Sequence, residues 1–464
     1  MTGPGLGPGL GPLTDVERRV LDAVDVDALV EALKPLIAID GSGGNETPAQ
    51  EHVAALMEEL GLDVDVWALE LEALRDDPAY SEELDRDEAL GVVGRLRGGA
   101  DGTGGGGASR AGRSLVLNGH VDVVPAGEPD RWTVPPFEAT VRDGRVYGRG
   151  TADMKGGLLS ALFALKAIRD AGVRLAGDVL VQSVVGEEDG GLGTLAAVRR
   201  GYTGDGAMVL EPTELVLAPA QAGAFNFRVT VPGKAAHGAL RAEGVDPIDR
   251  FIPLYRALQA LERRRNARPR HPMFADHALP YAVCVGTVRA GVWASTVAET
   301  LTFEGRMGVA PDEDPAAARR ELEAAIEEAY RAAAGAGTVE GAEPLEDVDT
   351  PAGADAWARD HPPVLEWWGG QFAPAATDPG SRIVTTARGA FAAVTGGPPD
   401  VHGMPYGADM RLLANEGGVP TVLFGPGDVR RAHAPDEYVE IAELETATKV
   451  VALTAMRFCG AAAS

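Results

Sequence analysis

The stretch SLVLNGHVDVVPAGEPDRWTVPPFEATVRDGRVYGRGTADMKGG, Ser114 to Gly157, decides the fold of this chain and points to its chemistry. It opens with an apolar run, Leu115–Leu117, that is typical of a buried strand and leads into His120 and Asp122. Further along, a glycine-punctuated turn presents Asp153 directly before a helical pattern. An imidazole and two carboxylates thus stand at the ends of buried elements, where loops carry chemistry. The stretch therefore predicts half of a metal site.

The composition limits the classes of function. A chain of 464 residues with 45% hydrophobic residues is expected to bury a real core in about two or three domains. Its formal net charge of -27 argues against binding to nucleic acid, whose phosphates require Lys and Arg. The same charge argues against an anionic membrane surface. We interpret the acidic residues as solvated faces that keep the protein soluble.

Cysteine usage and the chain start indicate the compartment. The two cysteines, Cys284 and Cys459, form neither a disulfide framework nor a zinc–thiolate pattern, which fits a reducing, cytoplasmic location. The start, residues 1–12, repeats Gly-Pro-Gly-Leu without the features of a signal peptide, and we expect a disordered tail. No apolar run is long enough to span a membrane.

Beyond the opening stretch, apolar strands again end in polar residues. These are Asp178–Val185 before Glu187 and Glu188, Ala207–Leu210 before Glu211, and Val419–Phe424 before His433. Helical patterns separate the strands, so the chain is expected to form an α/β sheet with its site at the carboxyl edge.

The middle of the chain has a different pattern. Strands and helices follow in the order βαββαβ, at Ala224–Val231, Pro247–Arg264, Tyr281–Arg289, Thr300–Val309, Pro315–Ala334 and Pro363–Phe372. This order predicts a small ferredoxin-like domain inserted into the chain.

The polar strand ends carry two imidazoles and several carboxylates but no thiols, a ligand mix typical of zinc, cobalt or manganese in a hydrolytic centre. Two metals need a bridging carboxylate and further ligands on each side. One metal would be bound by His120, Glu211 and the bridging Asp153. The other would be bound by Glu188, His433 and the same Asp153.

Two neighbours of these ligands remain for other roles. Glu187 is left free beside Glu188 and can act as general base on a water between the metals. Asp122 can accept the other ring proton of His120 and so fix its tautomer. Taken singly, each residue has an ordinary structural explanation; Asp153, for example, could be a helix N-cap. Their repeated position at strand ends or turns favours the metal site.

These motifs resemble those of a known family. They are His120-Val121-Asp122, Tyr147-Gly148-Arg149-Gly150, Asp153-Met154-Lys155-Gly156, Glu187-Glu188, Glu211-Pro212-Thr213, Gly407-Ala408-Asp409-Met410-Arg411, Gly425-Pro426-Gly427-Asp428 and Ala432-His433-Ala434-Pro435-Asp436-Glu437. The chain is similar to the co-catalytic zinc amidohydrolases and peptidases that include acetylornithine deacetylase, succinyl-diaminopimelate desuccinylase, aminoacylase and carboxypeptidase G. The resemblance covers nearly the whole chain beyond the tail.

The resemblance implies an α/β, zinc-peptidase-like catalytic domain with a central mixed sheet flanked by helices, formed by residues 13–221 and 377–464. Residues 222–376 would form the inserted ferredoxin-like α+β domain, which serves as lid and in dimerisation. The family's cofactor would be two Zn²⁺, or Co²⁺, per subunit of a homodimer. The Asp153–Met154 peptide would be cis.

The resemblance also implies residue roles. The metal ligands are those given above, and Glu187 would be general base and then proton donor. His237 would reach the partner subunit's site and stabilise the oxyanion, although a turn residue is the alternative. Arg306 and Gly425 would contact substrate, and a strand-face arginine is an equal alternative for Arg306.

The expected reaction is hydrolysis of the amide bond of an N-acyl amino acid or a related small acylated amine, as in deacetylases, desuccinylases and deformylases. A dipeptidase or carboxypeptidase using the same chemistry is the alternative. A relative that binds metal or an acylated ligand without turnover is a third, but it would be expected to lack Glu187 or a metal ligand, and none is lost. The stretch Trp293–Ala298 lacks the Asn and Pro that many members carry there, and resembles a deacylase subgroup.

Overall fold

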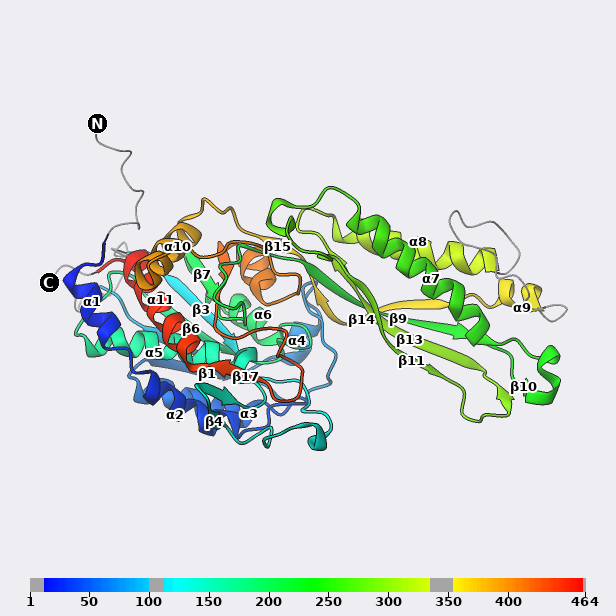
Figure 1. The fold of residues 1–464 in the computed structure, drawn as a ribbon, viewed down its shortest axis with the longest axis horizontal. Coiled ribbons are helices and arrows are strands. Elements are labelled where there is room, and N and C mark those ends of the chain that lie inside the picture. Colours follow the sequence, from blue (N-terminus) through cyan, green and yellow to red (C-terminus); the bar gives the residue numbers. More distant parts are fainter. Residues whose placement is uncertain (1–11, 100–111, 334–353, 462–464) are drawn as a thin grey trace. The chain divides into compact units, whose positions relative to one another are not determined.

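The computed structural model of the chain describes residues 12–99, 112–333 and 354–461. The predicted tail lies outside these residues except for Pro12. The chain divides into two compact units (Figure 1). The first comprises the described residues up to Gln221, Ala375–Met404 and the described residues from Ala408 onward, and the second comprises Ala222–Pro374 with Pro405–Gly407.

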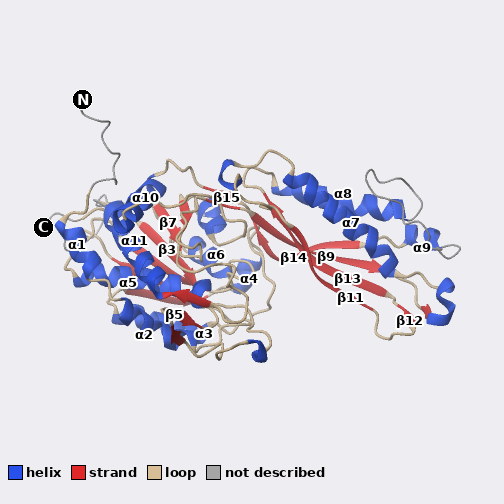
Figure 2. Ribbon diagram, viewed as in Figure 1, coloured by secondary structure: helices blue, strands red, loops and turns tan. Residues whose placement is uncertain are grey.

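A six-stranded mixed sheet forms the centre of the first unit (Figures 1 and 2). In spatial order its strands are β1 (Asp63–Ala68), β2 (Leu90–Leu96), β6 (Val179–Val184), β3 (Leu115–His120), β7 (Gly206–Val209) and β16 (Thr421–Leu423). The strands β6, β3, β7 and β16 pair in parallel, while β1 and β2 pair antiparallel. The predicted mixed sheet is confirmed, and four carboxyl ends meet at one edge.

Helices flank this sheet (Figure 2). They are α1 (Asp15–Asp22), α2 (Val26–Ile37), α3 (Thr47–Glu59), α4 (Leu71–Arg75), α5 (Gly156–Asp170), α6 (Leu192–Arg199), α10 (Arg382–Thr395) and α11 (Ile441–Cys459). A capping box formed by Thr14 and Glu17 opens α1. Helix α5 contacts β3 and α11, and nearly all its residues are buried, which fixes the segment that follows Asp153.

Short elements complete the first unit. Strands β4 (Thr140–Arg142), β5 (Arg145–Tyr147) and β17 (Tyr438–Glu440) form one small sheet, and β8 (Ala220–Gln221) pairs with β15 (Ala375–Ala376). Single helical turns are η1 (Pro129–Arg131), η2 (Thr151–Lys155) and η5 (Leu412–Glu416). The pairing of β5 with β17 joins the turn before Asp153 to a segment near the end of the chain.

The second unit has the predicted βαββαβ order. Its sheet runs β11 (Val283–Ala290), β13 (Thr300–Val309), β9 (Gly223–Pro232) and β14 (Val364–Phe372), all antiparallel. The helices are α7 (Pro247–Asn266), α8 (Pro315–Ala333) and α9 (Ala354–Asp360), with turns η3 (Gly238–Glu243) and η4 (Pro272–Phe274) and the strand pair β10 (Ala236–His237) and β12 (Thr296–Val297). Side chains of α7, such as Leu258, and of the sheet, such as Phe227 and Phe303, share one buried core.

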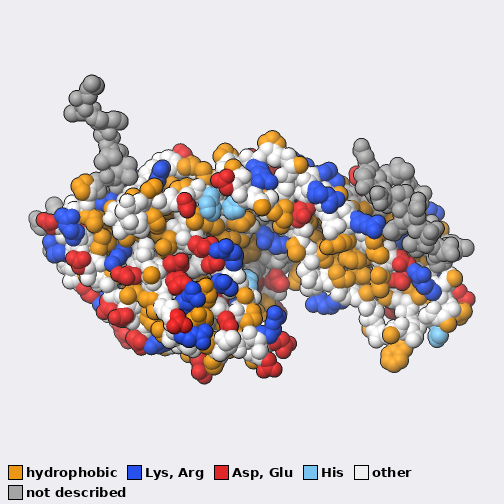
Figure 3. Space-filling view, in the orientation of Figure 1, with side chains coloured by type: hydrophobic (Ala, Val, Ile, Leu, Met, Phe, Trp, Pro, Cys, Tyr) orange, Lys and Arg blue, Asp and Glu red, His pale blue; other side chains and the backbone are white. Residues whose placement is uncertain are grey.

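The formal net charge of -27 reflects an excess of acidic side chains, some of which are visible on the surface. On the face drawn in Figure 3, acidic side chains lie scattered among basic and apolar ones. In the part of the chain that the structure describes, no helix combines the length and the apolar character needed to cross a membrane.

Candidate active site

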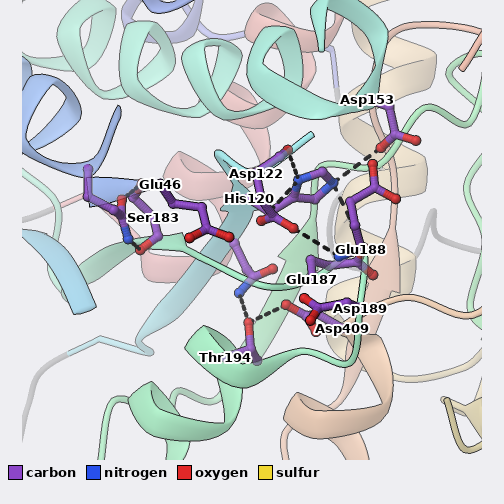
Figure 4. A network of polar contacts seen from close by, with 12 residues as sticks. Glu46, His120, Asp122, Asp153, Ser183, Glu187, Glu188, Asp189, Thr194 and Asp409 are labelled. Atoms are coloured by element: carbon purple, nitrogen blue, oxygen red, sulfur yellow. Dashed lines mark hydrogen bonds and ion pairs between the residues drawn. The ribbon is translucent and has the colours of Figure 1, made fainter. Parts of the chain in front are cut away.

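The carboxyl edge of the central sheet brings together residues that are far apart in sequence. His120 is the last residue of β3, Glu187 and Glu188 follow β6, and Glu211 follows β7. Because β6, β3 and β7 are parallel neighbours, these side chains emerge at the same edge. Figure 4 shows His120 between Asp122 and Asp153, with Glu187 and Glu188 on the adjacent loop.

The ring of His120 is fully buried and oriented by a hydrogen bond to the backbone. Its Nδ1 lies 2.9 Å from the backbone carbonyl oxygen of Asp122, which can only accept, so Nδ1 carries the proton. The Asp122 carboxylate, predicted for this role, lies 3.6 Å from Nδ1. Its Oδ2 instead accepts the N–H of Glu188 at 3.0 Å. With Nδ1 bonded to the backbone, Nε2 of His120 is the ring atom that can serve as a metal ligand.

Asp153 lies between two groups of candidate ligands. Its Oδ1 is 3.2 Å from Nε2 of His120, and its Oδ2 is 3.6 Å from Nε2 of His433. The first group is His120, Asp153 and Glu211, and the second is Asp153, Glu188 and His433. In each group the potential ligand atoms lie within 4.8 Å of one another. These are the two sets that the sequence analysis assigned, with each oxygen of Asp153 facing one set.

A buried ion pair that the sequence analysis did not assign holds the turn that presents Asp153. Glu437 accepts hydrogen bonds from the backbone N–H of Ala152 at 2.9 Å and of Asp153 at 3.1 Å. Its other oxygen accepts from Nη1 of Arg149 at 2.6 Å, and both side chains are buried. The Asp153–Met154 peptide is cis, as the resemblance implied. Arg149 and Glu437 stand in motifs quoted above, but their pairing is not visible in one sequence.

The second ligand group includes a more exposed histidine. Nε2 of His433 lies 3.0 Å from Oε2 of Glu188. Burial alone would lower the pKa of His433, but the carboxylates of Glu188 and Asp153 raise it to about 9. Without a metal, the imidazole of His433 is therefore protonated at neutral pH, because its positive charge is stabilised by the two carboxylates.

Glu187 is a carboxylate of the cluster that belongs to neither ligand group. It is buried, and its Oε1 has no hydrogen-bond partner in the described part of the chain. Its Oε2 lies 3.9 Å from Nε2 of His120. Burial, and then the nearby charge of Glu211, raise the pKa of Glu187 well above its ordinary value. Such a side chain is suited to taking and returning a proton.

The donor set fits divalent cations. Burial, followed by the charge of Asp153, raises the pKa of Glu211 well above its ordinary value, and its Oε1 lacks a hydrogen-bond partner among the described residues. Burial alone would lower the pKa of His120, but the charge of Asp122 and the contact of Nε2 with Asp153 raise it well above its ordinary value, so the position between Nε2 and Asp153 favours a cation. Tetrahedral zinc with ligands at about 2.1 Å places its ligand atoms about 3.4 Å apart, close to the 3.2 Å separation of these two atoms.

A second layer of polar side chains lies beneath the ligands (Figure 4). Nδ2 of Asn118 donates to Oγ1 of Thr194 at 2.8 Å, and Thr194 donates to Oδ2 of Asp409 at 2.5 Å. Burial raises the pKa of Asp409 to about 6. Asp409 belongs to the motif Gly407–Arg411, and its contact with Thr194 and its position beside Gly191 place it behind the loop that carries Glu187.

The remaining predicted site residues are placed as follows. His237 and Arg306 belong to the second unit, where His237 is exposed and its Nδ1 accepts the N–H of Ala239 at 3.2 Å. Arg306 lies on β13; burial lowers its pKa, and its Nε has no partner among the described residues. The N–H of Gly425 donates to Thr213 at 3.1 Å. Their contacts with substrate remain predictions.

Comparison with known proteins places the chain in a family. Residues 116–457 match the peptidase family M20/M25/M40. The chain is 31% identical over 450 residues to N-formyl-4-amino-5-aminomethyl-2-methylpyrimidine deformylase of Halalkalibacterium halodurans, covering 93% of this chain and 94% of the relative. It is 27% identical over 349 residues to a probable succinyl-diaminopimelate desuccinylase of Staphylococcus aureus, covering 70% of this chain and 78% of the relative.

Solved structures with the same fold include the di-peptidase Dug1p from Saccharomyces cerevisiae, with a TM-score of 0.73 and 14% identity over 96% of this chain and 98% of that one. Human carnosine dipeptidase 1 matches with a TM-score of 0.70 and 16% identity over 97% of this chain and 100% of that one. At these identities the likeness concerns the fold alone. Together with the family match and the deformylase relative, it confirms the resemblance inferred from the motifs: the chain belongs to the peptidase family M20/M25/M40.

Proposed function

We propose that the chain hydrolyses the amide bond of a small N-acylated amine at a centre of two divalent cations, zinc or cobalt. The observation that carries the proposal is the position of Asp153. Each of its oxygens faces one ligand group. The carboxylate of Glu187, which belongs to neither group, lies beside His120 of the first ligand group. Metal-dependent hydrolysis of an amide agrees with the family and with the deformylase and desuccinylase relatives.

The proposed mechanism assigns ligands by the two groups. His120 and Glu211 would hold one cation, Glu188 and His433 the other, and Asp153 both. When bound, the cations would polarise the scissile carbonyl and lower the pKa of an attacking water.

Glu187 would perform the proton transfers. It would take one proton from the water as the oxygen–carbon bond forms, and it would give that proton to the departing nitrogen as the carbon–nitrogen bond breaks. The products are a carboxylate and an amine. Its raised pKa favours this exchange, because the protonated form is then accessible during turnover.

The formyl group is the first acyl group to test. The deformylase relative aligns over 93% of this chain, whereas the desuccinylase relative aligns over 70%. We therefore propose an N-formyl amine, such as the formylated aminomethylpyrimidine that this relative's name gives, before acetyl or succinyl amino acids. The predicted homodimer and the lid role of the second unit are part of the proposal, and light scattering tests the dimer.

The deciding experiment measures acid release from a panel of substrates by the zinc- and the cobalt-loaded protein. The panel contains the N-formyl aminomethylpyrimidine, N-acetyl and N-succinyl amino acids, and dipeptides. Formate release at the highest kcat/KM supports the proposal, while preferential release of amino acids from dipeptides would establish the peptidase alternative.

The variant Glu187→Ala tests the mechanism on whichever substrate is turned over. We expect kcat to fall at least about 10²–10⁴-fold, the usual contribution of a general base. The metal content of the variant should equal that of the wild type, because Glu187 belongs to neither ligand group. Wild-type activity in this variant would exclude Glu187 as the base.

A further inference from the structure

The loop that carries Glu187 and Glu188 needs an external anchor. Residues 186–191 connect β6 to α6 and include Gly186, Gly190 and Gly191, whose φ angles are 66°, 146° and 78°. Glycines at positive φ allow the turn but leave the unfolded loop many conformations. The carboxylate of Glu187 has one oxygen without a hydrogen-bond partner among the described residues, so it does little to fix the loop.

The third acidic residue of the loop, Asp189, is one such anchor, beside Arg411, whose Nη2 donates to the carbonyl oxygen of Gly190 at 2.6 Å. Oδ2 of Asp189 accepts the backbone N–H of Glu83 at 3.2 Å and of Leu84 at 2.9 Å. The guanidinium of Arg86 donates to both oxygens, Nη1 to Oδ2 at 2.8 Å and Nη2 to Oδ1 at 2.9 Å. The segment 81–86 lies between α4 and β2, so a stretch from the first quarter of the chain holds the loop.

Arg86 is itself fixed from the other side. Its Nη2 donates to Oε1 of Glu46 at 2.6 Å, and its Nε lies 3.2 Å from the same oxygen. Glu46 directly precedes α3, and the side chains of Arg86, Glu46 and Asp189 are 1%, 2% and 7% exposed. A buried guanidinium between two carboxylates in this bidentate geometry joins α3 rigidly to the loop.

The loop also packs closely against the segment that carries Arg86. A Cβ on Gly190 would lie 2.0 Å from the backbone oxygen of Ser81. On the opposite side, the N–H of Glu188 donates to Oδ2 of Asp122 at 3.0 Å. The loop is therefore held between Asp122, whose carbonyl orients His120, and the Arg86 segment.

From these contacts we infer that Arg86 is a positioning residue for hydrolysis: through Asp189 it sets the placement of the proposed base Glu187 and of the proposed ligand Glu188. The inference rests on the proposed function, in which those two residues act in proton transfer and metal binding. It also gives a role to the acidic segment before β2, for which the sequence offered none.

The test uses the full chain with Arg86→Lys, which keeps the positive charge but cannot bond both carboxylates in a fork. We expect kcat to fall about 10- to 100-fold with KM changed less than about threefold, since a shift of about 1 Å in a catalytic group has an effect of that size. Zinc retained against a competing chelator should show an apparent affinity lowered about tenfold, as for other groups that support ligands.

Asp189→Asn is the second variant and covers the case in which Arg86→Lys folds poorly. It should lower kcat in the same way, and the double variant should be no worse than the more impaired single one, because the two residues act as one unit. Arg457→Met is the matched control: Arg457 forms a partly buried ion pair with Glu17 in the same unit, at 2.7 Å. It should lower the melting temperature without changing kcat of the folded protein.

The inference is overturned if folded Arg86→Lys keeps wild-type kcat and zinc affinity, if the Arg86 and Asp189 effects are additive, or if Arg457→Met lowers kcat equally. Failure of the proposed function gives a different result, because Glu187→Ala would then remain active whatever the Arg86 variants do.

Discussion

The substitution Glu437→Gln tests the buried pair that presents Asp153. Glutamine keeps one oxygen for the N–H groups of Ala152 and Asp153, now 2.9 and 3.1 Å from Glu437. Its amide N–H₂, however, would face the guanidinium of Arg149, which would remain as a buried charge without a counterion. Burial raises the pKa of Glu437 despite Arg149, so desolvation outweighs the attraction within the pair. Even so, removing one partner of such a pair costs about 3–5 kcal/mol.

Thermal unfolding monitored by circular dichroism measures this cost. A loss of about 3–5 kcal/mol should lower the melting temperature by roughly 5–10 °C in a domain of this size. The control is Glu440→Gln, which breaks the half-exposed pair of Glu440 with Arg145, 2.7 Å apart in the adjoining strands. Exposed pairs contribute about 0–1 kcal/mol, so the control should shift the melting temperature by less than about 2 °C.

Activity gives a second, independent measure of Glu437. Glutamine can still accept from Ala152 and Asp153, but repulsion between its amide N–H₂ and Arg149 would shift the side chain and weaken these two hydrogen bonds. The variant should therefore lower kcat about tenfold or more through misplacement of the Asp153 carboxylate. The reasoning is refuted if Glu437→Gln has the same melting temperature as Glu440→Gln and retains wild-type kcat. The ion pair of Glu437 with Arg149 would then neither stabilise the fold nor position the turn that carries Asp153.

Three further predictions concern other parts of the first unit. Gly425→Ala would place a Cβ 2.5 Å from the backbone oxygen of Glu211, so zinc affinity and kcat should both fall, as measured by chelator competition and steady-state assay. Burial lowers the pKa of Lys155 to about 8, from the ordinary lysine value of 10.5. Between these two pH values the unfolded chain therefore binds more protons than the folded chain, so the free energy of unfolding in urea should rise from about pH 8 to 10.5. A Lys155→Met variant should lack this rise. Equal pH slopes in the two proteins would contradict the assignment. Removing metal with a chelator should lower the melting temperature and zinc should restore it; a site at 1,000 times its Kd contributes about 4 kcal/mol.

The sequence predicted elements whose pattern is local. Strand β13 occupies Thr300–Val309 as predicted, and α7 begins at Pro247 as predicted and ends two residues later than expected, at Asn266. Likewise four of the five candidate ligands, all except Asp153, could be found because each stands at or after the end of an apolar strand, and parallel strands bring such ends together without further information.

Strand β2 shows where this reasoning fails. Leu90–Leu96 contains two glycines, which weaken a strand pattern. In the fold, a Cβ on Gly91 would lie 2.2 Å from the ring of Trp67, and one on Gly94 would lie 2.7 Å from the sulfur of Met57. Glycine is thus required by neighbours on β1 and α3, and that requirement becomes visible only when the sheet is assembled.

The same limit applies to the residues that surround the candidate site, and it explains why a single sequence points to the candidate ligands but not to these residues. Arg149 and Glu437 are 288 residues apart, and Arg86 and Asp189 are 103 apart. Each pair is buried, so removing one partner would leave the other as an unpaired buried charge at a high cost in stability. A single sequence, however, shows only four isolated charged residues. The candidate ligands and base cluster as carboxylates that repel one another, and such a cluster cannot organise itself. Its geometry must come from fully paired charges around it, and for this reason we expect substitutions at Arg86 and Glu437 to lower kcat although neither side chain is a proposed metal ligand.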